Sequence, residues 1–144
     1  MSLLNYLFGT PTTLDRNVSE LDMTMIRHII KCTAHWCTVN LGMNNERRMD
    51  MSIEVIPNLT ERLAGEFIES QNKIVIYYNR NKTVRDLVMT TIHEYVHYLQ
   101  PIRNNYKRML KEYGYDSHPM EIEARNAEQK YFTQAWSYVK TKII

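Results

Sequence analysis

Cysteine, glycine and proline are scarce in this chain of 144 residues, which contains two, four and four of them. So little cysteine excludes a small secreted domain held together by disulfides, and we expect Cys32 and Cys37 to be reduced thiols in the core. So little glycine and proline excludes collagen-like and low-complexity chains. No apolar run approaches the roughly 20 residues that span a bilayer, so we expect no membrane partner.

An excess of charge of one sign is also lacking, since 18 basic and 16 acidic residues leave a net charge of +2. The basic residues are scattered, so a nucleic-acid partner is not expected. The start, MSLLNYLFGTP, has no basic n-region and no small-residue cleavage site, so we expect no signal peptide and a cytoplasmic protein. A small chain rich in Asn, Tyr and Met is typical of a phage or bacterial protein, and a phage-encoded one would act in the host cytoplasm.

What the chain does contain is typical of one globular domain, with 44% hydrophobic and 24% charged residues. We expect a single domain over residues 1–144, of which 1–12 form an N-terminal arm that ends in Gly9-Thr10-Pro11. The arm has apolar side chains, Leu3, Leu4, Tyr6, Leu7 and Phe8. It packs on the core, lies across a cleft or joins two copies, and we expect a monomer or a weak dimer.

The hydrophobic periodicity predicts an α+β fold. Apolar residues recur at helical spacing over residues 17–40, 83–100, 102–112 and 116–141, and strand patterns cover residues 48–56, 64–69 and 73–78. The last two strand patterns flank a short polar turn, which favours a hairpin. We therefore expect a small, mainly antiparallel sheet of about three strands between an N-terminal helix and three C-terminal helices.

The pattern His93-Glu94-Tyr95-Val96-His97 lies in the helix predicted over residues 83–100. Two histidines four residues apart project from the same side of a helix and can share one metal ion. Neutral imidazoles suit zinc, and a catalytic zinc has three protein ligands and a water. Glu94 lies about 100° around the helix, where it can take a proton from that water. The motif predicts one Zn²⁺ ion, with Glu94 as the general base.

A third ligand is required, and the nearest carboxylates are Glu121 and Glu123 at the start of the last predicted helix. The sequence HEYVH, followed after 23 residues by a helix with E-x-E-A, resembles the gluzincin metallopeptidases, above all their small single-domain members, the minigluzincins. The resemblance implies a zincin-like fold in which a glutamate helix completes the zinc site. It implies Glu121 as the third ligand, with Glu123 as the alternative.

The chain departs from the gluzincin pattern at Arg125. Related enzymes have an aspartate there that accepts a hydrogen bond from a ligand histidine, whereas arginine has only donors. Asp86 and Glu128 are the candidates for this acceptor. Arg125 pairs with Glu121 or contacts the substrate.

The resemblance also implies a donor to the oxyanion, for which Tyr115 and His118 are favoured over Tyr113. It further implies a strand at the edge of the cleft that binds the substrate backbone, and the strand just before the motif is the candidate. Its expected substrate-binding residues are Ile74, Val75, Ile76 and Tyr77. The expected function is hydrolysis of extended peptide or protein substrates by a zinc metallopeptidase, and the alternative is a zinc-binding module without proteolytic activity.

One further group of possible ligands lies on the first long predicted helix. It consists of His28, Cys32, His35 and Cys37. The apolar spacing around Trp36 favours a core helix over a second zinc site.

Overall fold

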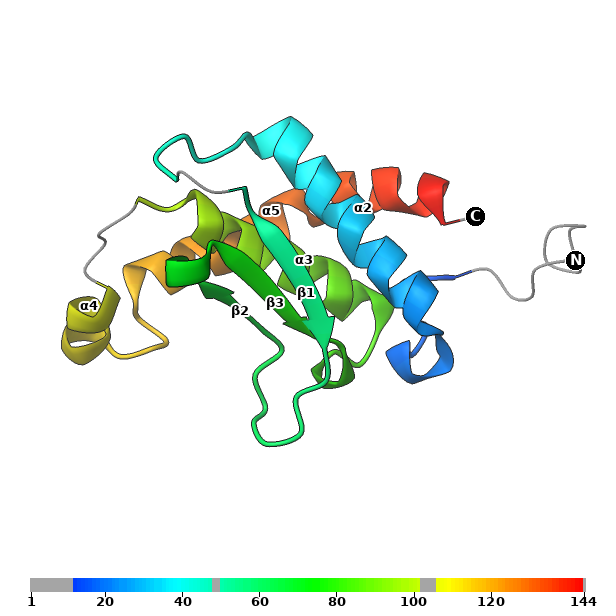
Figure 1. Cartoon of the computed structure of the whole chain (residues 1–144), viewed down its shortest axis with the longest axis horizontal. Helices are drawn as coiled ribbons and strands as arrows, with labels where there is room; N and C mark the ends of the chain where they lie inside the picture. Colours follow the sequence, from blue (N-terminus) through cyan, green and yellow to red (C-terminus); the bar gives the residue numbers. More distant parts are fainter. Residues whose placement is uncertain (1–11, 48–49, 102–105, 144) are drawn as a thin grey trace, which may run out of the picture.

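Four α-helices and three strands make up the part of the chain that the computed structural model describes, residues 12–47, 50–101 and 106–143 (Figure 1). In chain order they are α2 (Met23–Leu41), β1 (Ser52–Ile56), β2 (Gly65–Ile68), β3 (Lys73–Tyr77), α3 (Val84–Leu99), α4 (Tyr106–Tyr113) and α5 (Pro119–Lys142). Three short 3-10 helices accompany them, η1 (Val18–Glu20), η2 (Glu69–Gln71) and η3 (Tyr78–Arg80). The α+β class and the order of the elements are confirmed.

Local signals in the sequence account for the ends of the two helices at the centre of the fold. The Asp22 carboxylate accepts a hydrogen bond from the Met25 N–H at 2.8 Å and begins α2. Gly42 ends α2 with a φ of 86°, a left-handed conformation that glycine adopts without steric cost. Helix α3 begins with a capping box formed by Thr83 and Asp86.

The sheet has the strand order β1-β3-β2. Strand β2 pairs antiparallel with β3, so the predicted hairpin is confirmed. Strand β1, however, pairs parallel with β3, with Ser52 opposite Lys73 and Ile56 opposite Tyr77. The sheet is therefore mixed rather than mainly antiparallel, because the segment 57–64 carries the chain past the position of β3 to form the far strand first.

The central place of β3 contradicts the prediction that its residues bind a substrate strand. Both edges of β3 are hydrogen-bonded, to β1 and to β2, so its backbone has no free edge to offer. Ile74, Val75 and Ile76 are buried, and Tyr77 is half-buried. The prediction for residues 74–77 was wrong because edge and central strands have similar local sequences. The edge strands are β1 and β2, and the one that lines the cleft is β2.

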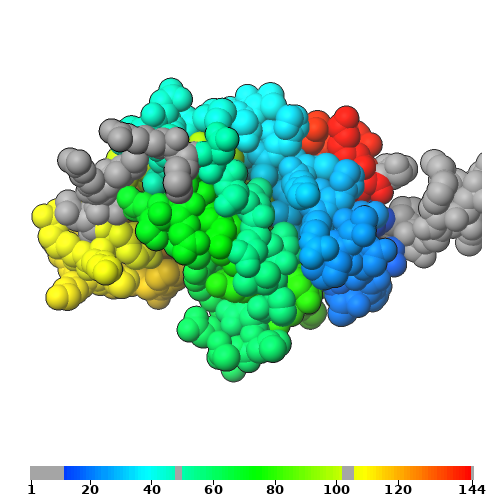
Figure 2. All heavy atoms as spheres, viewed as in Figure 1, coloured from blue at the N-terminus to red at the C-terminus, as the bar shows by residue number. Residues whose placement is uncertain are grey.

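Helix α3 lies at the centre of the molecule, between the sheet and the other long helices (Figure 1). It packs against β2 and β3 on one side and against α2 and α5 on the others. Its fully buried apolar side chains are Val84, Leu87, Val88 and Ile92. Helix α4 forms one end of the molecule in the space-filling view, where it is yellow (Figure 2). A helix packed on so many sides is a rigid support for any side chain that it carries.

Residues 1–11 lie outside the described residues, and so does every role predicted for the N-terminal arm. Within residues 12–47, 50–101 and 106–143, none of the helices combines the length and the apolar character that a bilayer crossing requires.

Candidate metal centre

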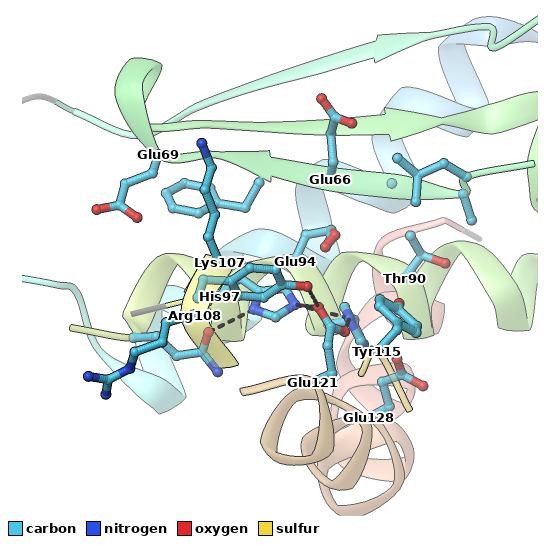
Figure 3. Close-up of a pocket in the computed structure, with 17 residues that line it drawn as sticks. Glu66, Glu69, Thr90, Glu94, His97, Lys107, Arg108, Tyr115, Glu121 and Glu128 are labelled. Carbon is cyan, nitrogen blue, oxygen red and sulfur yellow. Dashed lines mark hydrogen bonds and ion pairs between the residues drawn. The ribbon is translucent and has the colours of Figure 1, made fainter. Parts of the chain in front are cut away.

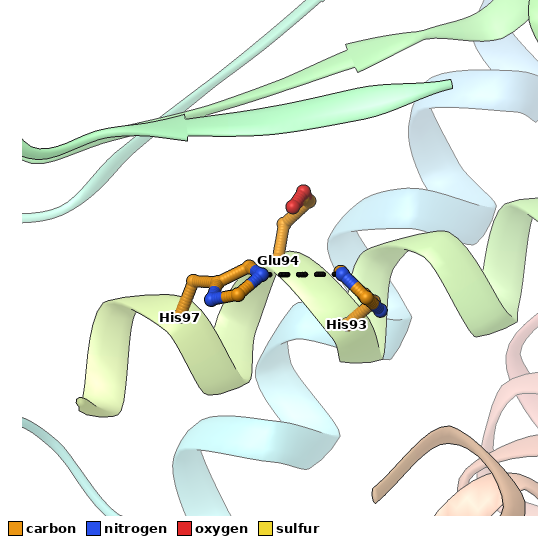
Figure 4. A group of neighbouring side chains, drawn as sticks. All are labelled: His93, Glu94 and His97. Atoms are coloured by element: carbon orange, nitrogen blue, oxygen red, sulfur yellow. Dashed lines mark hydrogen bonds between the residues drawn. The ribbon is translucent and has the colours of Figure 1, made fainter. Parts of the chain in front are cut away.

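His93 and His97 project from the same side of α3, one helical turn apart (Figure 4). Their Nε2 atoms lie 3.2 Å from each other. The carboxylate of Glu94 lies beside them, and ligand atoms of the three residues are all within 4.8 Å of one another. The i, i+4 spacing of the two histidines therefore produces the convergence that the motif predicted.

Glu121, in the first turn of α5, brings a carboxylate to both histidines. Its Oε2 lies 3.0 Å from Nε2 of His93, and its Oε1 lies 2.9 Å from Nε2 of His97. Glu123 points elsewhere, since its Oε1 accepts a hydrogen bond from Gln100 Nε2 at 3.1 Å. Of the two carboxylates that the sequence left open, the structure places Glu121 at the histidines.

Small side chains allow α5 to come this close to α3. Ala124 is fully buried and Ala127 nearly so, one and two turns after Glu121. Larger side chains at these positions would push the two helices apart. The separation that alanine permits is what lets a short glutamate side chain reach both imidazoles.

The donor groups of the three side chains are close enough to share one tetrahedral metal ion. Donors about 2.0 to 2.1 Å from a zinc ion lie about 3.3 Å from one another. The two Nε2 atoms are 3.2 Å apart, and Oε2 and Oε1 of Glu121 lie 3.0 Å from His93 Nε2 and 2.9 Å from His97 Nε2, respectively. Nδ1 of His93 lies 2.5 Å from Glu128 Oε1, and Nδ1 of His97 lies 2.7 Å from Gln100 Oε1. When both rings are neutral and carry their protons on Nδ1, the Nε2 lone pairs face each other and Glu121. Protons or a metal ion can neutralise this arrangement.

Glu128 resolves the difficulty raised by Arg125. It lies seven residues after Glu121, two helical turns along the same side of α5, and accepts the hydrogen bond from His93. Of the two acceptors that the sequence suggested, this one is confirmed.

Gln100 is the acceptor for the other histidine and joins three segments of the chain. Its side-chain N–H groups donate to Met120 O at 2.9 Å and to Glu123 Oε1 at 3.1 Å, which turns the amide oxygen toward His97. Its backbone carbonyl accepts from Asn44 Nδ2 at 3.1 Å and from Arg47 Nη2 at 3.3 Å. Gln100 was not among the predicted site residues, although its spacing three residues after His97, at the C-cap of α3, is a usable signal.

Asp86 does not accept a hydrogen bond from a histidine, contrary to the prediction that it is a candidate acceptor. Its carboxylate accepts hydrogen bonds from the N–H groups of Lys82 and Thr83, at 3.1 and 3.0 Å. Both of these hydrogen bonds belong to the start of α3, where Asp86 forms the capping box almost two turns before His93. Its position on the histidine side of the helix was correct, but the local backbone donors bind it first.

Arg125 does not contact Glu121 either. Its guanidinium donates to the backbone carbonyl of Asp116 and lies over the ring of Tyr115, 6.0 Å from the ring centroid. It therefore fastens the segment that precedes α5, so the predicted pair with Glu121 is wrong, and the predicted contact with a substrate stays a prediction.

His118 is fully buried and cannot stabilise an oxyanion in the cleft. It is the N-cap of α5, where its Nδ1 accepts from the Met120 N–H at 3.1 Å and its Nε2 donates to Tyr106 O at 3.0 Å. Both ring nitrogens are thus occupied. The prediction of a catalytic role was wrong because a histidine before a Pro at the first helical position also fits a cap.

Two tyrosine hydroxyls reach the same carboxylate as the histidines. Tyr106 Oη donates to Glu121 Oε1 at 2.9 Å, and the half-exposed Tyr115 also hydrogen-bonds to Glu121. Burial and the Glu121 charge raise the pKa of Tyr115 to about 12, so its hydroxyl keeps its proton at neutral pH. Tyr115 was predicted as an oxyanion donor, whereas Tyr106 was missed because only tertiary folding brings α4 to this site.

Burial and charge set the protonation of the central groups. Glu94 is 4% exposed, and this burial raises the pKa of its carboxyl to about 7 although the nearby histidines oppose the shift. Burial lowers the pKa of His93, but hydrogen bonds to Glu121 and Glu128 outweigh it and raise the value to about 10. Burial raises the pKa of Glu121, but hydrogen bonds with His93 and His97 outweigh it and hold the value far below its usual range. The site therefore attracts positive charge, whether as protons or as a metal ion.

The histidines, Glu94 and Glu121 lie on the floor of a cleft of about 860 Å³ (Figure 3). Strand β2 and the residues just before it form one wall, α3 forms the floor, and α4 and α5 form the other wall. Gly65 is the point of closest approach between β2 and the floor. A Cβ there would lie 3.2 Å from Glu94 Cγ and 2.8 Å from Thr90 Cγ2. The missing side chain brings the edge strand directly over Glu94.

The cysteines lie away from this cleft. Both are free thiols, Cys37 buried and Cys32 partly buried, as predicted. Burial raises the pKa of the Cys37 thiol to about 12, which makes it a poor metal ligand. His28 Nε2 lies 2.7 Å from the backbone carbonyl of Lys142. Within the described residues, the group on α3 is the one cluster of histidine, cysteine and acidic side chains with metal-binding spacing.

Comparisons of the chain with protein-family models, curated proteins and solved structures find no match.

Proposed function

We propose that the protein is a zinc-dependent peptidase that uses the gluzincin arrangement of ligands. The observation that carries the proposal is the meeting of His93, His97 and Glu121, with the buried Glu94 beside them, on the floor of a cleft bordered by an edge strand. His93, His97 and Glu121 would hold the metal. Zinc bound there would supply Lewis acidity, which lowers the pKa of water and polarises a carbonyl group.

Glu94 would move the proton. A water oxygen attacks the carbonyl carbon of the scissile peptide bond, and the Glu94 carboxylate takes the proton that the water loses. The same group then gives that proton to the departing amine nitrogen as the C–N bond breaks. A carboxyl pKa of about 7 suits a group that must accept and release a proton near neutral pH.

Strand β2 would hold the substrate in place of the central strand that the sequence suggested. Its outer edge has no strand partner in the described sheet, so an extended peptide can add to it through backbone hydrogen bonds. Gly65 would place that peptide next to Glu94. Binding along the edge of β2 favours unstructured or extended polypeptides as substrates.

The tyrosines of the far wall would stabilise the negative charge that develops on the carbonyl oxygen. Tyr106 and Tyr115 each carry a protonated hydroxyl that points at Glu121. A hydroxyl that leaves the carboxylate for the developing oxyanion would lower the barrier by charge-assisted hydrogen bonding.

The alternative, a zinc-binding module without proteolytic activity, drew its support from the arginine at position 125. Glu128 now supplies the acceptor that this arginine cannot, so the specific reason for that alternative is gone. The raised pKa of Glu94 also favours an enzyme over a closed structural site, where a buried acid beside the ligands would have no task.

The test is cleavage of a denatured, dye-labelled casein by the purified, zinc-loaded protein, with and without a chelator. Glu94→Gln is expected to keep its zinc and to lose at least about a hundredfold in rate, because the amide cannot take the proton. Glu123→Gln, the same change on a carboxylate that faces away from the histidines, is the matched control and should keep the wild-type rate.

Cleavage by Glu94→Gln at the wild-type rate would refute the mechanism. Stoichiometric zinc binding without cleavage of any unfolded substrate would favour the non-proteolytic module.

A further inference from the structure

Helix α4 carries two cations to one end of the cleft. Lys107 and Arg108 line it, and both side chains are exposed. Figure 3 shows Lys107 extending toward the wall that carries Glu69, while Arg108 points to the other side of the same end. Both residues thus line this end of the cleft, and their charged groups point in different directions from α4.

Neither cation is neutralised within the part of the chain that the structure describes. No carboxylate there lies within ion-pair distance of Lys107 or Arg108. Glu69, on the facing wall, is 4.0 Å from Arg47 instead. The two charges are available to a ligand.

The stability of α4 does not explain these cations. They occupy the first turn of a helix, where the partial positive charge of the helix end disfavours Lys and Arg. Lys111, in the last turn, is placed where a cation stabilises the helix. Lys107 and Arg108 thus do not stabilise α4. Their common position at the cleft points instead to a role in binding a ligand.

We propose that Lys107 and Arg108 form a carboxylate-binding subsite that makes the cleft prefer acidic peptides. This inference rests on the proposed function, since it names the substrate class of the same cleft. Lysine supplies a compact charge, and the planar guanidinium of arginine can hold a carboxylate with two parallel N–H groups. The carboxylate comes either from an Asp or Glu side chain or from the C-terminus of the peptide.

The two sources are distinguished by measuring the affinity of dye-labelled peptides for the zinc-loaded Glu94→Gln protein. The affinity is measured by fluorescence anisotropy at low salt. One set of dye-labelled ten-residue peptides carries a single Glu at successive positions of an Ala-, Ser- and Thr-containing sequence with an amidated C-terminus. A second set lacks Glu and ends in a free or an amidated C-terminus. Side-chain recognition favours one Glu position, and C-terminal recognition favours the free carboxylate.

Charge reversal then assigns the preference to the subsite. Lys107→Glu with Arg108→Glu is expected to weaken binding of the preferred acidic peptide about tenfold or more, and that of the neutral amidated peptide less than about twofold. Lys107→Gln with Arg108→Gln, which adds no repulsion, should give a smaller loss in the same direction. Lys111→Glu is the matched control on the same helix, outside the cleft lining, and should leave both affinities unchanged. Circular dichroism and zinc content verify that each variant is folded and loaded.

Equal affinity for acidic and neutral peptides overturns the subsite, and so does an equal loss in the Lys111→Glu control. The absence of binding by any peptide overturns it as well. Its failure is distinct from that of the proposed function: cleavage of casein with no acidic preference leaves the peptidase standing without the subsite. Lys107-dependent binding of acidic peptides without any cleavage leaves the subsite standing without the peptidase.

Discussion

Each histidine of the proposed metal site is held by a different kind of group, His93 by the carboxylate of Glu128 and His97 by the amide of Gln100. A carboxylate makes the imidazole a stronger donor to a metal than a neutral amide does. The two rings are therefore fixed equally well in orientation, but His93 is the more strongly polarised ligand.

Replacing Glu128 by Gln should weaken zinc binding. The amide can still accept from His93 Nδ1 but carries no charge, so we expect an affinity about 10- to 100-fold lower, measured by competition with a chromophoric chelator. Glu123→Gln is the control, because its amide oxygen can still accept from Gln100. An unchanged affinity in Glu128→Gln would mean that the short contact with His93 does not support the metal.

The absence of a side chain at residue 65 is the second residue-scale requirement. In Gly65→Ala the new Cβ would lie 2.8 Å from Thr90 Cγ2, too close for any ordinary contact. We expect a loss of about 1 to 3 kcal/mol in the free energy of unfolding, measured by urea denaturation. Adding Thr90→Ser removes the methyl group while keeping the hydroxyl that donates to Asn81 Oδ1, and should restore part of that loss. A double variant no more stable than Gly65→Ala would place the strain elsewhere.

At the scale of single elements, α3 depends on its capping box. Asp86→Ala removes the acceptor for the N–H groups of Lys82 and Thr83 and should cost about 1 kcal/mol of stability. Zinc affinity should not change, because the structure separates Asp86 from both histidines. Asp86→Asn, which keeps an acceptor oxygen, should lose less stability. A fall in zinc affinity larger than the fall in stability explains would return Asp86 to the metal site.

The elements were predictable from the sequence where the signal is local. Helical periodicity predicts α2, α3 and α5, although α2 begins at Met23, six residues after the start of the predicted helix, because Asp22 caps it and residues 18–20 form a 3-10 helix. The i, i+4 spacing alone predicts that His93 and His97 meet. Glu121 required the resemblance to gluzincins in addition, because no local pattern relates α5 to α3.

What could not be predicted depends on which partner a residue meets in space. The pattern of β3 does not say that it is central, because strand order is set by the path of residues 57–64. Asp86 and His118 are plausible site residues by spacing, yet nearby backbone groups bind both of them. Tyr106 lies 15 residues before Glu121, and only the placement of α4 brings them together.

At the scale of the whole molecule, the pKa shifts predict that the free energy of unfolding of the metal-free protein decreases as the pH rises. The folded-state pKa of Glu94, about 7, and of His93, about 10, both exceed their ordinary values of 4.5 and 6.5. A group with a raised folded pKa stabilises the fold below its unfolded pKa, and this contribution is lost as pH rises through the folded pKa. The loss from Glu94 thus falls between about pH 4.5 and 7, and that from His93 between about pH 6.5 and 10.

Thermal unfolding in a chelator should therefore give a Tm that falls between pH 6 and pH 10. Added zinc should raise the Tm, and by more at pH 8 than at pH 6, because protons compete with the metal for the same Nε2 atoms. A zinc-induced increase that is larger at pH 6 would contradict this account of the site.

The junction at Gln100 extends the metal site to a part of the molecule that touches no ligand. Asn44 and Arg47 hold the backbone of Gln100, whose side chain holds His97 on one side and the first turn of α5 on the other. Any change that shifts the loop before β1 should therefore also shift the side chains that would bind the metal. A natural variant at Asn44 would therefore change the metal affinity without touching a ligand. A fluorescent dye attached at the neighbouring, exposed residue 45 would change its signal when the metal binds.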